Sequence, residues 1–187
     1  MAKGKVLVMH DNDMLVPQDY TAQIIERFRE GYEVMNLKRF IFYLNEAHSR
    51  RIYSSDALSL DEAPEAIVQN LEAGGSVAIS RDAYFEIGGF DESFVGWGGE
   101  DNEFWERAQT RKIWPYGYLP LIHLWHTPQA EKSAAVRPTA GMMNLRLAVS
   151  ASQRILELSK RDFGGTRQTD PPYGPLCNRQ ERNNART

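Results

Sequence analysis

The chain has 187 residues, of which 42% are hydrophobic and 25% charged, so it is long enough to bury the core of one ordinary globular domain. Its formal net charge of −3, with no stripe of Lys and Arg, gives no reason to expect a nucleic-acid partner. The single cysteine, Cys177, excludes a disulfide within the chain, and there is no run of 18 apolar residues that would predict a transmembrane helix.

The first predicted element is a strand at residues 6–9, an unbroken apolar run of the kind that is buried on both faces of a sheet. Asp11 and Asp13 follow it directly. Ligands of open α/β sheets gather at the carboxyl ends of strands, and Mg²⁺ and Mn²⁺ prefer carboxylate oxygens. The pair is therefore a candidate metal or ligand site. The alternative is a solvated turn, because Asp and Asn are ordinary turn formers.

The next elements follow from capping signals and periodicity. Residues 17–30 predict a helix with Pro17 near its first turn, and residues 32–37 predict a strand. The apolar run at 40–44 fits a helix or a strand, and its aromatic side chains fit the core. Residues 61–73, which are acidic near their start, predict another helix.

A pair of glycines, Gly74 and Gly75, precedes Ser76 and a predicted strand at 77–79. Glycines ahead of a strand allow a sugar or a phosphate to approach the backbone closely. The short helix predicted at 81–87 has a structural explanation, because a serine stands at its N-cap and two glycines follow its end.

The stretch at 95–102 carries the strongest functional signal. Its glycines let the backbone come close to a ligand, and acids in the first turn of a helix are placed to act on that ligand. The structural alternative is that the acids only stabilise the helix dipole, by roughly 0.3–1 kcal/mol. The Trp-Gly-Gly that precedes them favours a functional role. The candidate residues are Trp97, Gly98, Gly99, Glu100, Asp101 and Asn102.

Two histidines, His123 and His126, interrupt a short apolar run at 121–126. In a regular strand they would point to opposite faces, whereas a turn or an irregular strand end would bring both to one metal ion. Periodicity does not decide between the two. A buried histidine is also often a hydrogen-bonded core residue.

Near the C-terminus, residues 142–160 predict one longer helix. The side chains along its face are Leu145, Val149, Ser152, Leu156 and Lys160. The composition then changes abruptly to Gly, Pro and polar residues without periodicity. We therefore expect one domain at 1–160 and a polar, mostly disordered tail at 161–187.

Together, the motifs at 10–14, 74–80, 87–92, 96–101 and 123–126 resemble the catalytic half of glycosyltransferases of the GT-A fold. The resemblance is to the C-terminal catalytic domain of the β-1,4-galactosyltransferases, which polypeptide N-acetylgalactosaminyltransferases and chondroitin-type polymerases share in part. It implies an α/β fold, a mixed sheet with flanking helices, and transfer of a hexose or N-acetylhexosamine from a UDP-sugar to a saccharide hydroxyl.

The resemblance implies a metal site. Asp13 would bind the Mn²⁺, or Mg²⁺, that bridges the diphosphate of the UDP-sugar. His126 would be a second ligand. His123 stands where the galactosyltransferases have Met, and an imidazole nitrogen suits Mn²⁺ better than a thioether does.

The resemblance also implies a general base and the residues around it. Asp101 stands where inverting galactosyltransferases have the base that takes the proton from the acceptor hydroxyl, whereas the retaining N-acetylgalactosaminyltransferases have Asn there. Glu100 and Trp97 would lie at the acceptor. The remaining substrate-binding residues would be Gly98, Gly99, Asn102, Gly74, Gly75, Ser76 and Asp11.

The same resemblance sets expectations for the rest of the chain. The segment at 127–141 is a candidate lid over donor and metal. The nucleotide-binding half that normally precedes the Asp-x-Asp strand is missing, so we expect either a truncated product, or a homodimer or partner chain that completes the site, or a domain that binds sugars without transferring them. We expect a cytoplasmic enzyme, with no signal peptide, that in bacteria works at the inner face of the membrane on polysaccharide biosynthesis.

Two other classes of function remain open. A strand that runs into Asp-x-Asp also resembles the start of a haloacid-dehalogenase-type phosphatase, in which the first Asp is the nucleophile. That hypothesis leaves the Trp-Gly-Gly-Glu-Asp motif unexplained. The other is a carbohydrate-binding or assembly module that does not catalyse transfer.

Overall fold

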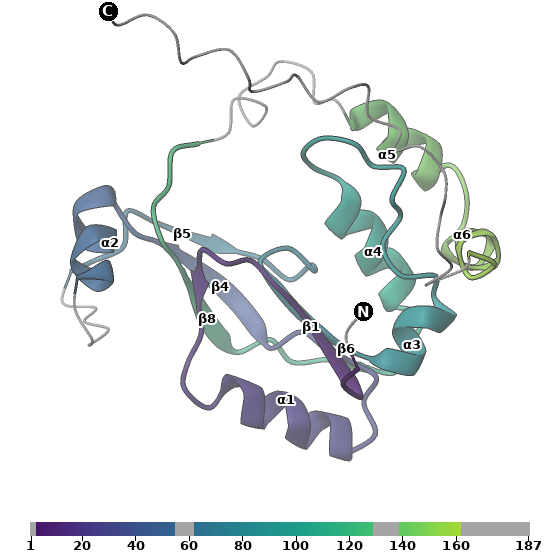
Figure 1. Ribbon diagram of the computed structural model, residues 1–187, viewed down its shortest axis with the longest axis horizontal. Helices are drawn as coiled ribbons and strands as arrows, with labels where there is room; N and C mark the ends of the chain where they lie inside the picture. The colour runs from purple at the N-terminus through teal and green to yellow at the C-terminus, as the bar shows by residue number, and fades with distance from the viewer. Residues whose placement is uncertain (1–2, 55–61, 129–138, 162–187) are drawn as a thin grey trace, which may run out of the picture.

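The computed structural model describes residues 3–54, 62–128 and 139–161, which form two four-stranded sheets with helices on either side (Figure 1). In the first sheet the strand order is β1 (Val6–His10), β6 (Ser76–Ser80), β3 (Val34–Met35) and β7 (Ile113–Trp114). In the second it is β2 (Met14–Leu15), β8 (Leu119–His123), β4 (Lys38–Tyr43) and β5 (Ala66–Gln69). Both sheets are mixed, because β3–β7 and β4–β8 are parallel while the other pairs are antiparallel. The expected α/β class with mixed strand pairing is therefore present.

The chain passes directly from one sheet to the other at four places, residues 11–13, 36–37, 70–75 and 115–118. Each passage joins strands that belong to different sheets and contains no helix. Polar residues and glycines are concentrated there, because the backbone leaves the regular ladder at these points. The passages hold most of the groups discussed below.

The helices pack on both sides of the strands. Figure 1 places α1 (Tyr20–Arg29) on one side and α3 (Arg81–Glu86) and α4 (Glu100–Ala108) on the other. Strand β6 separates two core clusters, since Ala78 packs with the α1 side while Val77 and Ile79 pack with the α3 and α4 side. This alternation is the two-residue period of a strand that is buried on both faces.

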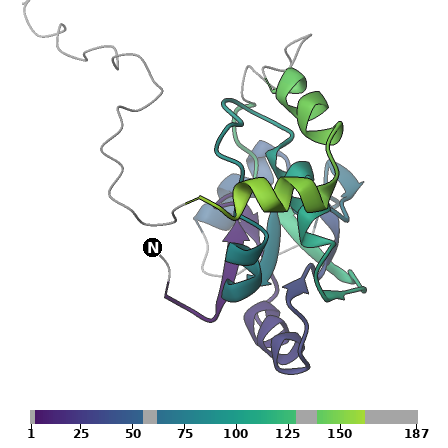
Figure 2. The ribbon, with the colours of Figure 1, turned by 90° about the vertical axis from the view of Figure 1, so that its right-hand side faces the viewer.

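Three further helices complete the described structure. They are α2 (Glu46–Tyr53), α5 (Ala140–Leu147) and α6 (Ala151–Leu158). In Figure 2, α6 runs in front of the other helices, and Arg154 ties it to α4 through a buried ion pair of 2.9 Å with Glu103. Glu103 also pairs with Arg107, at 2.5 Å, and all three side chains are almost completely buried. This ionic cluster fixes α4, because removing one partner would leave an uncompensated buried charge.

Several expected elements are present. The helix expected at 17–30 is α1, the capped helix at 81–87 is α3, and the run at 40–44 belongs to strand β4. Ser80 caps α3 by accepting a hydrogen bond from the backbone N–H of Ala83. The strand expected at 32–37 is only Val34–Met35.

The expectation that strand 6–9 is buried on both faces is wrong. Strand β1 is an edge strand that pairs only with β6 among the described strands, and Val8 is 45% exposed. A continuous apolar run fits this position as well, because one face of β1 still packs against the core.

The helix expected at 61–73 is also wrong. Residues 66–69 form strand β5, which pairs antiparallel with β4. The β-branched Ile67 and Val68 favour a strand, and Pro64 interrupts any helix that would run through it. Cross-strand pairing therefore outweighs the acidic helix-start signal.

The single helix expected at 142–160 is two helices. Ser150 begins α6 with a capping box, in which its hydroxyl accepts from Gln153 N and the Gln153 side chain returns to the Ser150 backbone. The expected apolar face points outward, since Leu145 and Leu156 are 67% and 64% exposed, whereas Leu158 is buried. Of the expected tail at 161–187, only Arg161 is described, and it forms an ion pair of 2.8 Å with Asp91. Positions 162–187 lie outside the described residues, as do positions 129–138 of the candidate lid.

None of the helices in the described ranges is both long and apolar enough to cross a membrane.

The packing of α6 against the loop after α3 predicts a strong effect of a small substitution. Gly88 has a φ of +85°, and a Cβ atom there would lie 2.8 Å from the Leu158 carbonyl carbon. Gly88→Ala should lower the free energy of unfolding by about 2–4 kcal/mol, because strain and overlap add. Urea unfolding measures this. Gly141→Ala is the matched control, since a Cβ meets nothing within 4 Å at that position, and an equal loss in both variants would contradict the packing described.

Candidate active site

A tight turn between β1 and β2 carries both acids of the Asp-x-Asp motif. Asp11 N donates to the Gly75 carbonyl (3.0 Å), which ties the turn to the first sheet. Leu124 N donates to the Asp13 carbonyl (2.8 Å), which ties it to the second. Met14 N closes the turn on the Asp11 carbonyl (3.1 Å). The motif is therefore fixed where the two sheets meet.

Asp13 lies against both histidines. Its Oδ2 atom is 3.1 Å from His126 Nε2 and 3.6 Å from His123 Nε2. The ligand atoms of the three side chains all lie within 4.8 Å of one another. Strand β8 ends at His123, so the irregular backbone after it brings His126 round to the same side. Of the two alternatives for His123 and His126, the structure therefore has the irregular strand end, which brings both histidines to one side.

The surroundings of the Asp–His–His triad fit a metal ion. Asp13 Oδ1 is buried, and no described residue gives it a hydrogen bond. The His123 ring stacks on Tyr43, with 4.5 Å between the ring centroids, which holds the imidazole in place. One carboxylate and two imidazoles are a donor set that suits divalent transition metals.

The glycine loop leads into the first turn of α4. Gly96, Gly98 and Gly99 all have φ near +100°, so the loop uses a conformation that other residues rarely adopt. Glu100 and Asp101 stand at the start of the helix, as expected. Glu100 Oε2 is buried without a hydrogen-bond partner among the described residues, so one oxygen of this acid is left for a group that the chain does not supply.

Asp101 lies directly against the glycine pair. A Cβ atom on Gly74 would be 3.1 Å from Asp101 Oδ2, which is tighter than an ordinary contact. Gly74 is therefore required for close approach between the 70–75 passage and α4. Asn102 strengthens this contact by donating a hydrogen bond to the Glu72 carboxylate.

The pKa of Asp101 is raised to about 6. Burial is the main cause, and the negative charges of Glu100, Asp11 and Glu72 add to it, whereas the positive charge of Lys38 opposes it. A carboxylate with a pKa near neutrality is a better general base than one with the ordinary value. The group is thus suited to accept a proton at physiological pH.

Lys38 is a site residue that the sequence analysis missed. It is 0% exposed, and its ammonium group donates to Asn36 Oδ1 (3.1 Å), the Ser76 carbonyl (3.2 Å) and the Glu72 carbonyl. Burial lowers the pKa of Lys38 to about 8, against the opposing effect of the nearby acids. The available signal was a lysine within the apolar stretch at 34–44.

Three other residues predicted from the sequence have these positions in the structure. Trp97 is half-buried, and its carbonyl accepts a hydrogen bond from Thr139 Oγ1 (3.0 Å). Gly75 has a φ of +85°, and its carbonyl holds Asp11. Ser76 is 1% exposed and its Oγ lies 2.8 Å from the Tyr20 hydroxyl, so its side chain faces the core and only its backbone is near the site.

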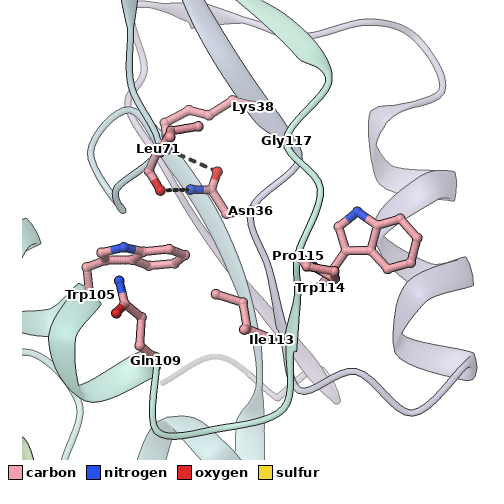
Figure 3. Close-up of a pocket in the computed structure, with 9 residues that line it drawn as sticks. All are labelled: Asn36, Lys38, Leu71, Trp105, Gln109, Ile113, Trp114, Pro115 and Gly117. Carbon is pink, nitrogen blue, oxygen red and sulfur yellow. Dashed lines mark hydrogen bonds between the residues drawn. The ribbon is translucent and has the colours of Figure 1, made fainter.

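A pocket of about 400 Å³ is lined in part by Lys38 (Figure 3). Trp105 of α4 and Gln109, the residue that follows this helix, line one wall, and Asn36, Lys38 and Leu71 line the opposite wall. None of its lining residues was predicted from the sequence. The Asn36 amide is occupied, because it donates to the Leu71 and Glu72 carbonyls (both 2.9 Å).

Comparisons with known proteins find similarity to glycosyltransferases, and the family match covers the segment that holds Asp101. A family model described as the N-terminal domain of galactosyltransferase matches residues 67–115. Rat β-1,4-galactosyltransferase 4 is 40% identical over 40 residues, which are 21% of this chain and 12% of that enzyme. A probable N-acetylgalactosaminyltransferase 9 of Caenorhabditis elegans is 40% identical over 58 residues, 29% of this chain and 9% of that protein. Escherichia coli chondroitin synthase is 56% identical over 32 residues, 17% and 5% of the respective chains.

These matches show which class of protein the chain resembles. The chain resembles the galactosyltransferase-like glycosyltransferases, as the motifs had indicated. The matched segment contains Gly74, Trp97 and Asp101 but not the triad of Asp13, His123 and His126. The chain spans only about an eighth or less of the length of these relatives.

The negative charges around Asp101 predict how the pKa of Asp101 changes when the charge of Glu100 is removed. Glu100→Gln should lower the pKa of Asp101 below about 6, because a like charge that disfavours the ionised form is lost. Carboxyl ¹³C NMR measures this titration, with the Asp101 signal assigned by its loss in Asp101→Asn. Glu65→Gln serves as the control, because Glu65 is exposed and is not among the charges that act on Asp101. A midpoint that stays in place or rises in Glu100→Gln would contradict the described coupling.

Proposed function

We propose that this chain is a metal-dependent glycosyltransferase domain that transfers a hexose or N-acetylhexosamine from a UDP-sugar to a saccharide hydroxyl with inversion. The observation that carries the proposal is Asp101, a half-buried acid with a pKa of about 6 at the start of α4, within the galactosyltransferase match. The Asp11–Asp13 turn links this acid to the triad.

In this proposal, Asp13, His123 and His126 hold the metal ion. When bound, the ion would supply positive charge to the diphosphate and so stabilise UDP as a leaving group. Two imidazole nitrogens favour Mn²⁺ over Mg²⁺, which prefers an all-oxygen shell. The orphaned Asp13 Oδ1 and the stacking of His123 on Tyr43 support a preformed ligand set.

Asp101 acts as the general base. It accepts the proton of the acceptor hydroxyl while the hydroxyl oxygen forms a bond to the anomeric carbon and the bond from that carbon to the UDP oxygen breaks. The attack comes from the face opposite to UDP, so the anomeric configuration inverts. An aspartate rather than an asparagine at this position supports inversion, because an amide is not a base.

The remaining residues bind the two substrates. Trp97 offers an aromatic face to a sugar ring, and Glu100 and Asn102 offer hydrogen bonds beside the base. Gly98 and Gly99 keep the loop free of side chains that would block the acceptor. Gly74, Gly75 and the Ser76 backbone line the donor sugar, and Asp11 lies between donor and base.

Metal-dependent UDP binding tests the donor half of the proposal. Isothermal titration should show that UDP binds in the presence of Mn²⁺ and that Asp13→Ala abolishes this binding, because one of three ligands is lost. Asp19→Ala is the matched control, since Asp19 is exposed at the start of α1 and remote from the triad. Binding of a glycan without any UDP binding would support a non-catalytic module instead. Phosphatase activity lost in Asp11→Asn would support the dehalogenase-type alternative.

Removal of the base tests the catalytic half. Asp101→Asn should reduce the transfer rate by about 10²–10⁴-fold, because the amide cannot accept the proton. UDP and Mn²⁺ binding should be retained, since Asp101 is not a metal ligand here. Rates are measured as UDP released in the presence of a saccharide acceptor. Full activity in Asp101→Asn would contradict the assignment.

The pH dependence follows from the same pKa. The base works only when deprotonated, so kcat/KM should rise with pH, reach half its maximum near pH 6 and level off above it. In Glu100→Gln the rising limb should move to lower pH, because the pKa of Asp101 falls. A limb near the ordinary carboxyl value, about 4, in the wild type would show that a different group limits the rate.

A further inference from the structure

Lys38 places a buried positive charge beside the acid cluster. The residue begins β4, directly after the 36–37 passage, and its side chain is fully enclosed. Its ammonium group donates three hydrogen bonds, and all of them end on uncharged oxygens, those of Asn36, Glu72 and Ser76. Thus the hydrogen bonds satisfy the ammonium group as a donor but leave its charge uncompensated.

Hydrogen bonding alone does not explain a lysine at this position. Asn36 already links the 36–37 passage to the 70–75 passage through two bonds to the Leu71 and Glu72 carbonyls. Burial of an ammonium ion is costly, and an apolar side chain of the same shape often serves stability as well or better. What Lys38 adds and no apolar residue could replace is its charge.

Lys38 and Asp101 lie against the same short segment, the 70–75 passage and Ser76. The Lys38 ammonium group donates to the Glu72 and Ser76 carbonyls, and a Cβ atom on Gly74, which stands between these two residues, would be 3.1 Å from Asp101 Oδ2.

The charge of Lys38 therefore acts on acids from three segments. Asp101 of α4, Glu72 of the 70–75 passage and Asp11 of the β1–β2 turn each favour the protonated form of Lys38. The effect is mutual. Glu100, Asp11 and Glu72 all disfavour the ionised form of Asp101, and Lys38 is the cation that opposes them.

We propose that Lys38 is a positioning residue, whose buried ammonium group keeps the Asp101 carboxylate charged among its three acidic neighbours so that this carboxylate can accept a proton. The Glu72 and Ser76 carbonyls fix the ammonium group, which therefore cannot turn away to solvent. The catalytic consequence rests on the proposed function, whereas the coupling between Lys38 and Asp101 does not.

The test compares Lys38→Met with the wild type, because Met keeps the length of the side chain and removes its charge. The ¹³C titration midpoint of Asp101 should move from about 6 to higher pH by about one unit. Transfer at pH 6 relative to pH 8 should then fall about five-fold, since less of the base is ionised. Lys112→Met, which removes an exposed lysine that lies over the Tyr32 ring, should leave the midpoint in place.

An Asp101 midpoint that is unchanged in Lys38→Met would overturn the proposal. A loss of activity by the same factor at every pH, with the midpoint in place, would assign Lys38 a purely structural role and would also overturn it. A shifted midpoint in a protein whose wild type transfers no sugar supports the coupling and contradicts only the proposed function.

A reciprocal measurement covers the case in which Lys38→Met does not fold. Coupling is mutual, so Asp101→Asn should lower the midpoint of the Lys38 ammonium group from about 8. The ¹³C signal of the Lys38 Cε atom reports this titration in the full chain. A Lys38 midpoint that does not move in Asp101→Asn would overturn the proposal.

Discussion

The site depends on one short turn, residues 11–14, that bridges two sheets. One backbone hydrogen bond ties it to Gly75, next to the Gly74 that contacts Asp101, and another ties it to Leu124, between the two histidines. Because β2 and β8 pair with Met14 opposite His123, Asp13 can only lie next to that histidine. The register of a two-residue strand thus decides whether a metal site exists, and the same turn carries Asp11 towards Asp101.

The second constraint is the density of like charge. Asp11, Glu72, Glu100 and Asp101 lie close enough for each of the other three to raise the pKa of Asp101. A diphosphate would add more negative charge, so the arrangement needs cations. Lys38 supplies one from within the fold, and the triad is suited to hold another. The density of acids is therefore a physical reason for a lysine to be buried beside them.

The sequence indicated those parts of the fold that rest on local signals. The serine cap of α3, the glycines before β6 and the acids that open α4 are each decided by a few neighbouring residues. The helix expected at 61–73 is absent because pairing of β5 with β4 outweighs the acidic helix-start signal. The helix expected at 142–160 is divided because the cap at Ser150 begins a second helix, which the hydrophobic periodicity did not predict. The role of Lys38 was not predicted because two of its three hydrogen-bond partners lie 34 and 38 residues away in the chain. His123 and His126 meet because strand β8 ends at His123, which periodicity did not predict.

The most direct test of the central claim, that one turn joins a metal site to the base, is paramagnetic NMR with Mn²⁺. Bound Mn²⁺ should broaden both the ³¹P signals of UDP and the carboxyl ¹³C signal of Asp101 in the wild type, and neither signal in Asp13→Ala. Broadening of the UDP signals without any effect on Asp101, or broadening that persists in Asp13→Ala, would contradict a single site built on this turn.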